Sequence, residues 1–115
     1  MEETQQKTTK VENTRRENGT MAELNINILR EMSFELNNGE RKCVLKMTGA
    51  ASNTFTLEVI VKEIECINDL ATIYTEPGEF MFDLSVSTWE IIDEDGWKTY
   101  KVSEEIGNFY YFCFI

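Results

Sequence analysis

Apolar and polar residues alternate along much of this chain, which is the pattern of strands with one buried face. Two segments show this alternation most clearly. In the first, Phe55, Leu57, Val59 and Val61 alternate with Thr54, Thr56, Glu58 and Lys62, and in the second, Phe80, Phe82, Leu84 and Val86 alternate with Glu79, Asp83, Ser85 and Ser87. Successive side chains of a strand point to opposite faces, so each segment predicts one core-facing and one solvent-facing side. Several such segments separated by turn residues predict a mainly β fold, a small antiparallel β-sandwich or barrel of about six to eight strands.

Residues 24–36 alternate as well, but Leu29 and Arg30 exchange the apolar and polar positions. A bulge in a long strand explains such an exchange. A helix is the alternative, because four apolar residues recur at every fourth position. They are Leu24, Ile28, Met32 and Leu36. Asparagines, which are weak helix formers, and the Asn38-Gly39 turn signal after the segment favour the strand.

Two dipeptides, Asn38-Gly39 and Asp95-Gly96, predict hairpins with two-residue turns. In both, the implied register places opposite charges on one face and apolar residues on the other. The pairs predicted for the first hairpin are Glu35 with Lys42, Glu31 with Lys46, Phe34 with Cys43, and Met32 with Leu45. The pairs predicted for the second are Glu90 with Lys101, Asp93 with Lys98, Trp89 with Val102, and Ile91 with Tyr100.

Two further segments need separate interpretation. Residues 63–75 fit one short helix or two strands around an Asn68-Asp69 turn, and the β character of their surroundings favours the strands. The chain ends in Phe109–Ile115, seven apolar or aromatic residues without a charge. Such a run predicts a strand that is buried on both faces or packed against a partner.

The chain divides into an arm and one domain. Residues 1–20 are polar, with four acids against four bases, and offer too little apolar surface to offset the entropy of ordering. We therefore expect a disordered arm over 1–20 and a single acidic β domain over 21–115.

The domain carries the whole net charge of −10, because it holds 17 acids against seven bases. Ten of these acids lie in the 35 residues between Lys62 and Lys98, which contain no Lys or Arg. Such a charge repels nucleic acid and anionic membranes and attracts basic protein surfaces. Solubility alone is the competing explanation for a net negative charge.

Few residues suggest catalysis or metal binding. The chain has no His, which removes the commonest general base and metal ligand, and no glycine-rich phosphate loop. The acidic turn Asp93-Glu94-Asp95-Gly96 lacks the spacing of a calcium loop. The three cysteines lie far apart in apolar runs, which predicts free thiols in a reducing cytoplasm and no metal or redox site. We expect no enzyme activity and no cofactor.

The sequence thus predicts a non-enzymatic, cytoplasmic module that docks on a basic surface, one evolved to hold nucleic acid, as a nucleic-acid mimic. Phage- or plasmid-borne inhibitors of host nucleases, including anti-CRISPR-type proteins, are typical of this class. An exposed Trp97 among acids would suit an Arg-rich partner. The predicted contact residues are Asp93, Glu94, Asp95, Trp97, Glu90, Asp83, Glu79 and Glu76.

A virion or assembly subunit is the alternative, in which Phe109–Ile115 completes the sheet of a neighbour and forms a homo-oligomer. A small-ligand carrier with an open barrel is a third reading, based only on the aromatic content.

Overall fold

The computed structural model describes residues 9–11, 21–37, 39–49, 51 and 53–115. One helix, α1 (Met21–Ser33), continues into a 3-10 turn, η1 (Phe34–Leu36), and precedes most of the strands. The strands are β1 (Thr9–Val11), β2 (Arg41–Thr48), β3 (Thr54–Ile67), β4 (Leu70–Glu76), β5 (Glu79–Asp83), β6 (Ser87–Glu94), β7 (Trp97–Glu104) and β8 (Phe109–Phe114). The prediction of a mainly β fold is confirmed.

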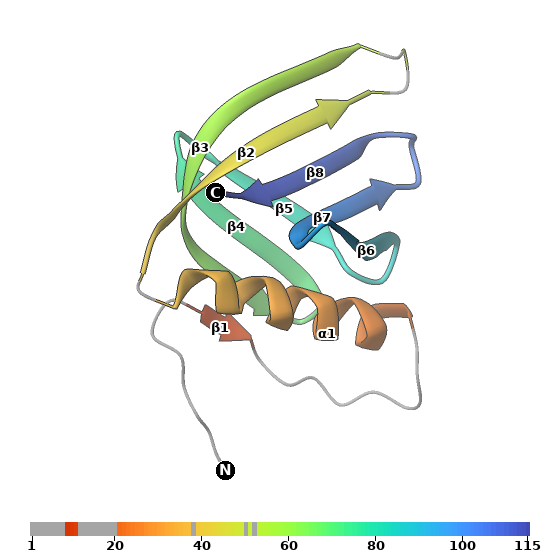
Figure 1. The fold of residues 1–115 in the computed structure, drawn as a ribbon. Helices are drawn as coiled ribbons and strands as arrows, with labels where there is room; N and C mark the ends of the chain where they lie inside the picture. The colour runs from red at the N-terminus through yellow and green to blue at the C-terminus, as the bar shows by residue number, and fades with distance from the viewer. Residues whose placement is uncertain (1–8, 12–20, 38, 50, 52) are drawn as a thin grey trace.

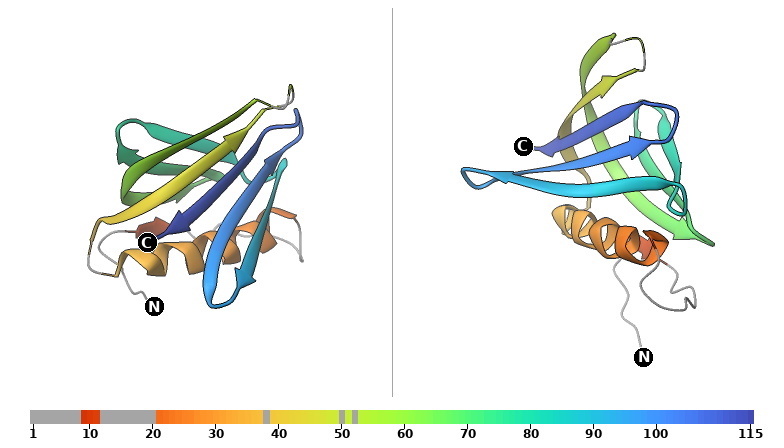
Figure 2. Two further views of the ribbon diagram at one scale, coloured as in Figure 1. Left: turned by 45° about the horizontal axis from the view of Figure 1, so that its top comes forward. Right: turned by 90° about the vertical axis from the view of Figure 1, so that its right-hand side faces the viewer.

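Seven antiparallel strands form one sheet in the order β5-β4-β3-β2-β8-β7-β6. The sheet curls so that β4 and β5 lie behind β8 and β7, and α1 runs across the open end (Figure 1). A bulge at Lys62, between Val61 and Glu63, bends the long strand β3 and switches the parity of its buried side chains. β5 and β6, the two ends of this strand order, are not hydrogen-bonded to each other, so the sheet is strongly curled and does not close into a barrel (Figure 2).

The core lies inside the curl. Aromatic rings from opposite ends of the sheet meet there edge to face, with Phe82 4.9 Å from Tyr110 and 5.6 Å from Trp89 between ring centroids. Such edge-to-face pairs add to the stabilisation that comes from apolar burial. The helix completes this core and lies beside β6.

The strand predicted over residues 24–36 is wrong, because this segment forms α1 and η1. The residues that face the core recur with helical spacing; they are Ala22, Asn25, Ile26, Leu29, Met32, Ser33 and Leu36. Leu29, an exception to the alternation, is fully buried, whereas Leu24 and Phe34 are each 58% exposed. The true period is therefore that of a helix.

The hairpin predicted at Asn38-Gly39 is wrong for the same reason. The Gly39 amide donates to the Leu36 carbonyl at 2.9 Å, as the chain leaves the helical segment. Gly39 has a φ of 106°, which suits glycine at the end of a helix. The strand that follows, β2, pairs with β3 and β8 rather than with residues 31–36, so none of the four predicted pairs forms.

The other two turn predictions are confirmed. All four predicted pairs of the Asp95-Gly96 hairpin occur in the register of β6 and β7, and both turn residues have positive φ, 54° and 84°. Asn68 and Asp69 likewise have positive φ, 50° and 66°, and join β3 to β4. Residues 63–75 are therefore strands, and these turns have the backbone twist that two-residue hairpins favour.

The C-terminal strand β8 lies in the middle of the sheet, between β2 and β7. Its Phe112 and Phe114 are buried in the core. Both of its edges are paired within the chain, so it offers no free edge for completing the sheet of a neighbour. The prediction of strand addition through this segment is therefore wrong.

Most of the predicted arm, residues 1–8 and 12–20, lies outside the described residues. Within it, Thr9–Val11 form β1, which pairs in parallel with Ile64–Cys66 of β3. The polar composition of the arm did not predict this strand. Among the described residues, no helix is long and apolar enough to cross a membrane.

The free cysteines differ in accessibility, which gives a first testable prediction. Cys43 and Cys66 are buried, and burial raises the pKa of the Cys43 thiol to about 12, whereas Cys113 is half-buried. Because the thiolate is the reactive form, we expect one thiol, Cys113, to react with iodoacetamide in the native protein at mildly alkaline pH. Mass spectrometry should find all three modified in urea. Rapid modification of Cys43 in the native protein would contradict the burial.

Candidate interaction site on the β6–β7 hairpin

The hairpin formed by β6 and β7 carries five of the eight predicted contact residues. It projects beyond the rest of the sheet (Figure 2, right). Glu90, Asp93, Glu94 and Asp95 are exposed, and Trp97 beside the turn is 59% exposed. Glu90, Glu94 and Trp97 lie on the outer face of the sheet, while Asp93 lies on the face that also carries Lys98. The tip therefore presents carboxylates on both sides and an indole on one.

Two lysines of β7 stand opposite these acids, but both are engaged elsewhere. Lys98, the register partner of Asp93, places its Nζ 3.1 Å from Glu31 Oε2 of α1. This hydrogen bond is the main cause of the raised pKa of Lys98. Lys101, the register partner of Glu90, places its ammonium 5.1 Å from the centre of the Phe109 ring and 5.7 Å from that of Tyr111.

The acids of the hairpin are consequently left without an ion pair at close range, although Asp93 still contributes to the raised pKa of Lys98. Glu90, Asp93, Glu94 and Asp95 make no hydrogen bond or ion pair with any residue that the structure describes. Their charges are exposed to solvent and available to a partner. An exposed tryptophan beside them adds an amphipathic contact that could cover the aliphatic stem or guanidinium of an arginine.

The base of the hairpin is fixed to the helical segment through Glu35. One carboxylate oxygen of Glu35 accepts a hydrogen bond from the Tyr100 hydroxyl at 2.8 Å, and the other lies 2.7 Å from Arg41. Burial and the bond to Glu35 raise the pKa of Tyr100 well above its usual range. These bonds hold α1 and η1 against β7, at a point four residues from the turn.

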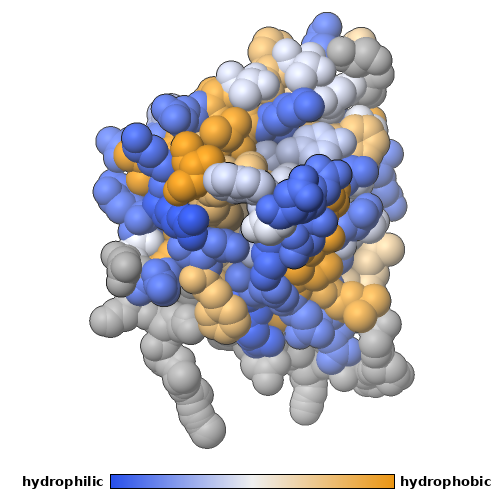
Figure 3. All heavy atoms as spheres, viewed as in Figure 1, coloured by the Kyte–Doolittle hydropathy of each residue, from blue (hydrophilic) through white to orange (hydrophobic). Residues whose placement is uncertain are grey.

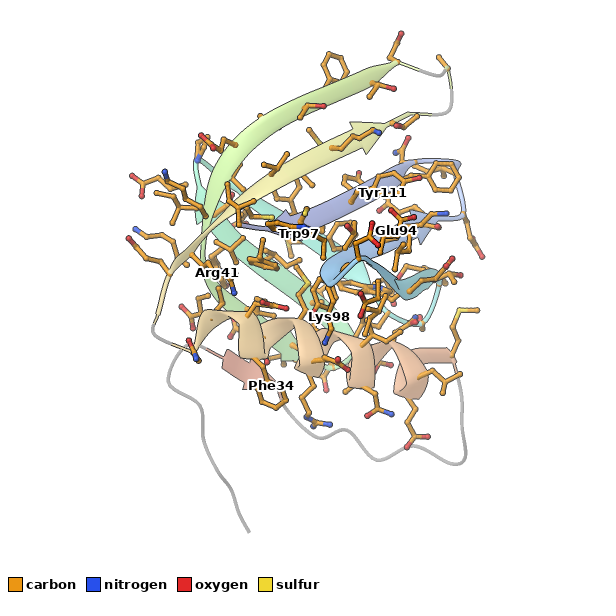
Figure 4. All side chains as sticks on the ribbon, viewed as in Figure 1. Phe34, Arg41, Glu94, Trp97, Lys98 and Tyr111 are labelled. Carbon is orange, nitrogen blue, oxygen red and sulfur yellow. The ribbon has the colours of Figure 1, made fainter. Side chains whose placement is uncertain are left out.

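Two shallow hollows lie between the hairpin and the helical segment and share Glu35 and Lys98. Among the side chains that line them, Figure 4 labels Phe34, Arg41, Trp97 and Lys98. One has a volume of about 480 Å³ and reaches Phe34, and the other has about 330 Å³ and reaches Trp97. Their carboxylates are already bonded to Lys98, Tyr100 and Arg41. Neither hollow therefore offers an unbonded carboxylate to a bound molecule.

The other three predicted residues lie elsewhere. Glu76, Glu79 and Asp83 belong to β4 and β5, at the opposite end of the strand order from β6. The β4–β5 turn and the β6–β7 turn lie on different sides of the molecule (Figures 1 and 2). Glu76 pairs with Lys62 at 3.3 Å. The eight predicted contact residues therefore lie on two separate surfaces. Only the surface on the hairpin combines acids with Trp97.

Asp83 has a local structural role. Its carboxylate accepts hydrogen bonds from the Ser85 amide at 2.9 Å and from the Ser85 hydroxyl at 2.6 Å. These bonds hold the pKa of Asp83 below its usual value. They order the turn between β5 and β6, so Asp83 has a structural role that requires no binding partner.

Glu31 and Glu35 were missed in the sequence analysis, because a strand reading places them in a hairpin with Lys46 and Lys42. Their spacing of four residues is a helical signal that could have identified a common face. Among the described residues, no group of three or more His, Cys, Asp or Glu side chains could hold a metal ion.

Comparison with known proteins does not assign the chain to a family or a function. No protein-family model matches it, and no curated protein or solved structure is significantly similar.

Proposed function

We propose that this protein is a non-enzymatic binding module of the cytoplasm, which docks on a basic protein surface through the tip of the β6–β7 hairpin. The contact residues are Asp93, Glu94, Asp95 and Trp97, with Glu90 at the margin. The partner is a nuclease or another nucleic-acid-binding protein, and the tip competes for the surface that holds its nucleic acid. An anti-defence inhibitor of the anti-CRISPR type is the corresponding biological class.

The diversion of Lys98 and Lys101 supports this proposal most directly. The register brings each lysine opposite a hairpin acid, yet one bonds Glu31 and the other covers aromatic rings. If the acids served only folding, local pairing would be the simplest arrangement. Instead, the tip keeps its negative charge exposed, while Lys98 and Tyr100 of the same hairpin bond to the helical segment. An exposed negative charge suits rapid, electrostatically steered association.

The spacing of the carboxylates suits a phosphate mimic. Alternate residues of a strand lie about 6.6 Å apart on one face, close to twice the rise of about 3.4 Å per phosphate along one strand of a duplex. Glu90 and Glu94 are four residues apart on the outer face, about 13 Å or close to four phosphate steps, and Asp95 follows in the turn. A cationic groove that accepts a phosphate backbone could therefore meet several carboxylates at once.

Salt dependence of capture tests this proposal. We expect the immobilised full chain to retain a basic protein from host lysate at low ionic strength and to release it in high salt, because counter-charges at an exposed tip are screened. The released protein, identified by mass spectrometry, should lose nucleic-acid binding when the chain is added. Retention of only acidic or neutral proteins, or retention unaffected by salt, would contradict the proposal.

A further inference from the structure

We propose that the outer face of the sheet around β8 binds a second copy of this chain, giving a reversible dimer. This inference does not rest on the proposed function, although its surface shares Trp97 with the hairpin site and borders Glu90 and Glu94. It replaces the predicted association through a strand edge, which the pairing of β8 rules out, by association through a sheet face.

The register groups apolar side chains on this face. Because alternate residues share a face, the outer side chains of β8 are Phe109, Tyr111, Cys113 and, continuing past the strand, Ile115. Cys113 lies opposite Val44 of β2 and Thr99 of β7. Ile115 extends this pairing, since its amide donates to the Lys42 carbonyl at 3.2 Å.

The same alternation adds residues from neighbouring strands. We call the resulting group the outer apolar face; it consists of Val44, Ile60, Ile92, Trp97, Cys113 and Ile115. Trp97 and Ile115 are 59% and 48% exposed, and the other four are half-buried. Figure 3 shows apolar side chains gathered over β2 and the end of β8 on the side toward the viewer.

A central strand with apolar side chains on both faces is typical of a strand that is covered on both faces. The core covers the inner face of β8, with Phe112 and Phe114 buried. No described element covers the outer face, since α1 lies beside β6 and in the core. Contiguous exposed apolar groups of this kind are characteristic of interaction surfaces.

The charges around the outer apolar face indicate which partner fits. Three lysines and three glutamates surround or adjoin it: Lys42, Lys46, Lys101, Glu58, Glu90 and Glu94. They cancel, although the whole chain carries −10. A second, equally acidic chain is repelled least at this neutral face, and the six charges supply both signs for contacts across a dimer. A strongly basic partner would instead meet the three lysines.

The dimensions indicate a reversible contact. Five strands at about 4.8 Å and two residue rows, each about 6.6 Å wide, span roughly 20 by 13 Å, on the order of 250 Å² per copy. Stable interfaces bury about 800 Å² per partner. The face is thus too small for a permanent dimer, so the contact should be weak and reversible.

Sedimentation equilibrium of the full chain from micromolar to millimolar concentration tests the proposal. We expect a monomer–dimer equilibrium that strengthens as salt is raised, because salt screens the repulsion between two chains of −10 and leaves apolar contacts in place. Binding through the hairpin acids should weaken under the same change. A chain that stays monomeric across this range in high salt overturns the proposal, whatever the result of the capture experiment.

A matched pair of variants locates the contact. Ile115→Asp places a charge in the outer apolar face and should reduce dimerisation at least tenfold, whereas Ile106→Asp makes the same change in the β7–β8 turn, at a residue 71% exposed, and should not. Ile92→Glu provides a second variant on the face, and thermal melting confirms that each variant is folded. Equal dimerisation of Ile115→Asp and Ile106→Asp would place the contact elsewhere.

Cys113 provides a readout on the unaltered protein. Since its thiol lies in the outer apolar face, its alkylation should slow as the dimer forms with rising concentration. A rate that stays constant while dimer accumulates would overturn the assignment of this face.

Discussion

Replacing Asn25 with alanine is expected to lower the free energy of unfolding by about 3 kcal/mol. The Asn25 side chain is buried and bonds three backbone groups, one in the turn before β6 and two at the start of β6. Its amide nitrogen donates to the Leu84 carbonyl at 2.8 Å and to the Ser87 carbonyl at 2.7 Å, and its oxygen accepts from the Trp89 amide at 3.2 Å. Alanine would leave these groups buried without partners, which costs more than the loss of an exposed hydrogen bond.

Asn27→Ala is the matched control, because Asn27 lies on the same helix and is exposed. Alanine is the better helix former, so this change should raise stability slightly, by up to about 0.6 kcal/mol. Urea unfolding followed by circular dichroism measures both variants. Opposite signs are expected, and equal small effects would show that Asn25 does not join the helix to the sheet.

The role of Asn25 explains why the N-terminal segment was misread from sequence. Asparagine is a weak helix former, and three of them near residues 25–37 favoured a strand. In the fold, the buried contacts of Asn25 outweigh its propensity. Leu29 pointed to a helix instead. It is apolar where a two-residue alternation requires a polar residue, but it fits the buried face of a helix.

The two Gly-containing turn signals show the limit of local reasoning. Both implied registers sorted charges and apolar groups correctly, but only Asp95-Gly96 lies between two strands. At Asn38-Gly39 the preceding segment is helical, and β2 takes its partners from β3 and β8. Pairing across a turn can be read from adjacent residues, whereas pairing between distant strands depends on how the whole sheet closes.

The candidate site was predictable in part. The acids and Trp97 of the hairpin follow from the sequence and one turn. The engagement of Lys98 by Glu31 requires α1 to lie against β7, and the position of Lys101 over Phe109 requires β8 beside β7. Neither contact could be read from local pattern, and together they leave the hairpin acids without a close ion pair among the described residues.

Reversing the charge of the hairpin tip is expected to reduce association with the salt-eluted partner at least about tenfold at low ionic strength, mainly through the on-rate. The variant is Asp93→Lys with Glu94→Lys and Asp95→Asn. Asparagine is chosen for the last position because Asp95 has a φ of 54°, a conformation that asparagine tolerates and lysine does not favour. The three changes shift the net charge from −10 to −5.

The control variant is Glu40→Lys with Glu63→Lys and Glu105→Gln, which shifts the net charge by the same amount at exposed positions away from the hairpin. If the position of the charges matters, the control should keep most of the wild-type on-rate, and the two variants should converge as salt screens the exposed charges. Surface changes of this kind usually alter stability by no more than about 0.5 kcal/mol each, so melting temperatures verify that both are folded. Equal loss in both variants would mean that net charge alone attracts the partner. No loss in either would leave solubility as the explanation for the acidic composition.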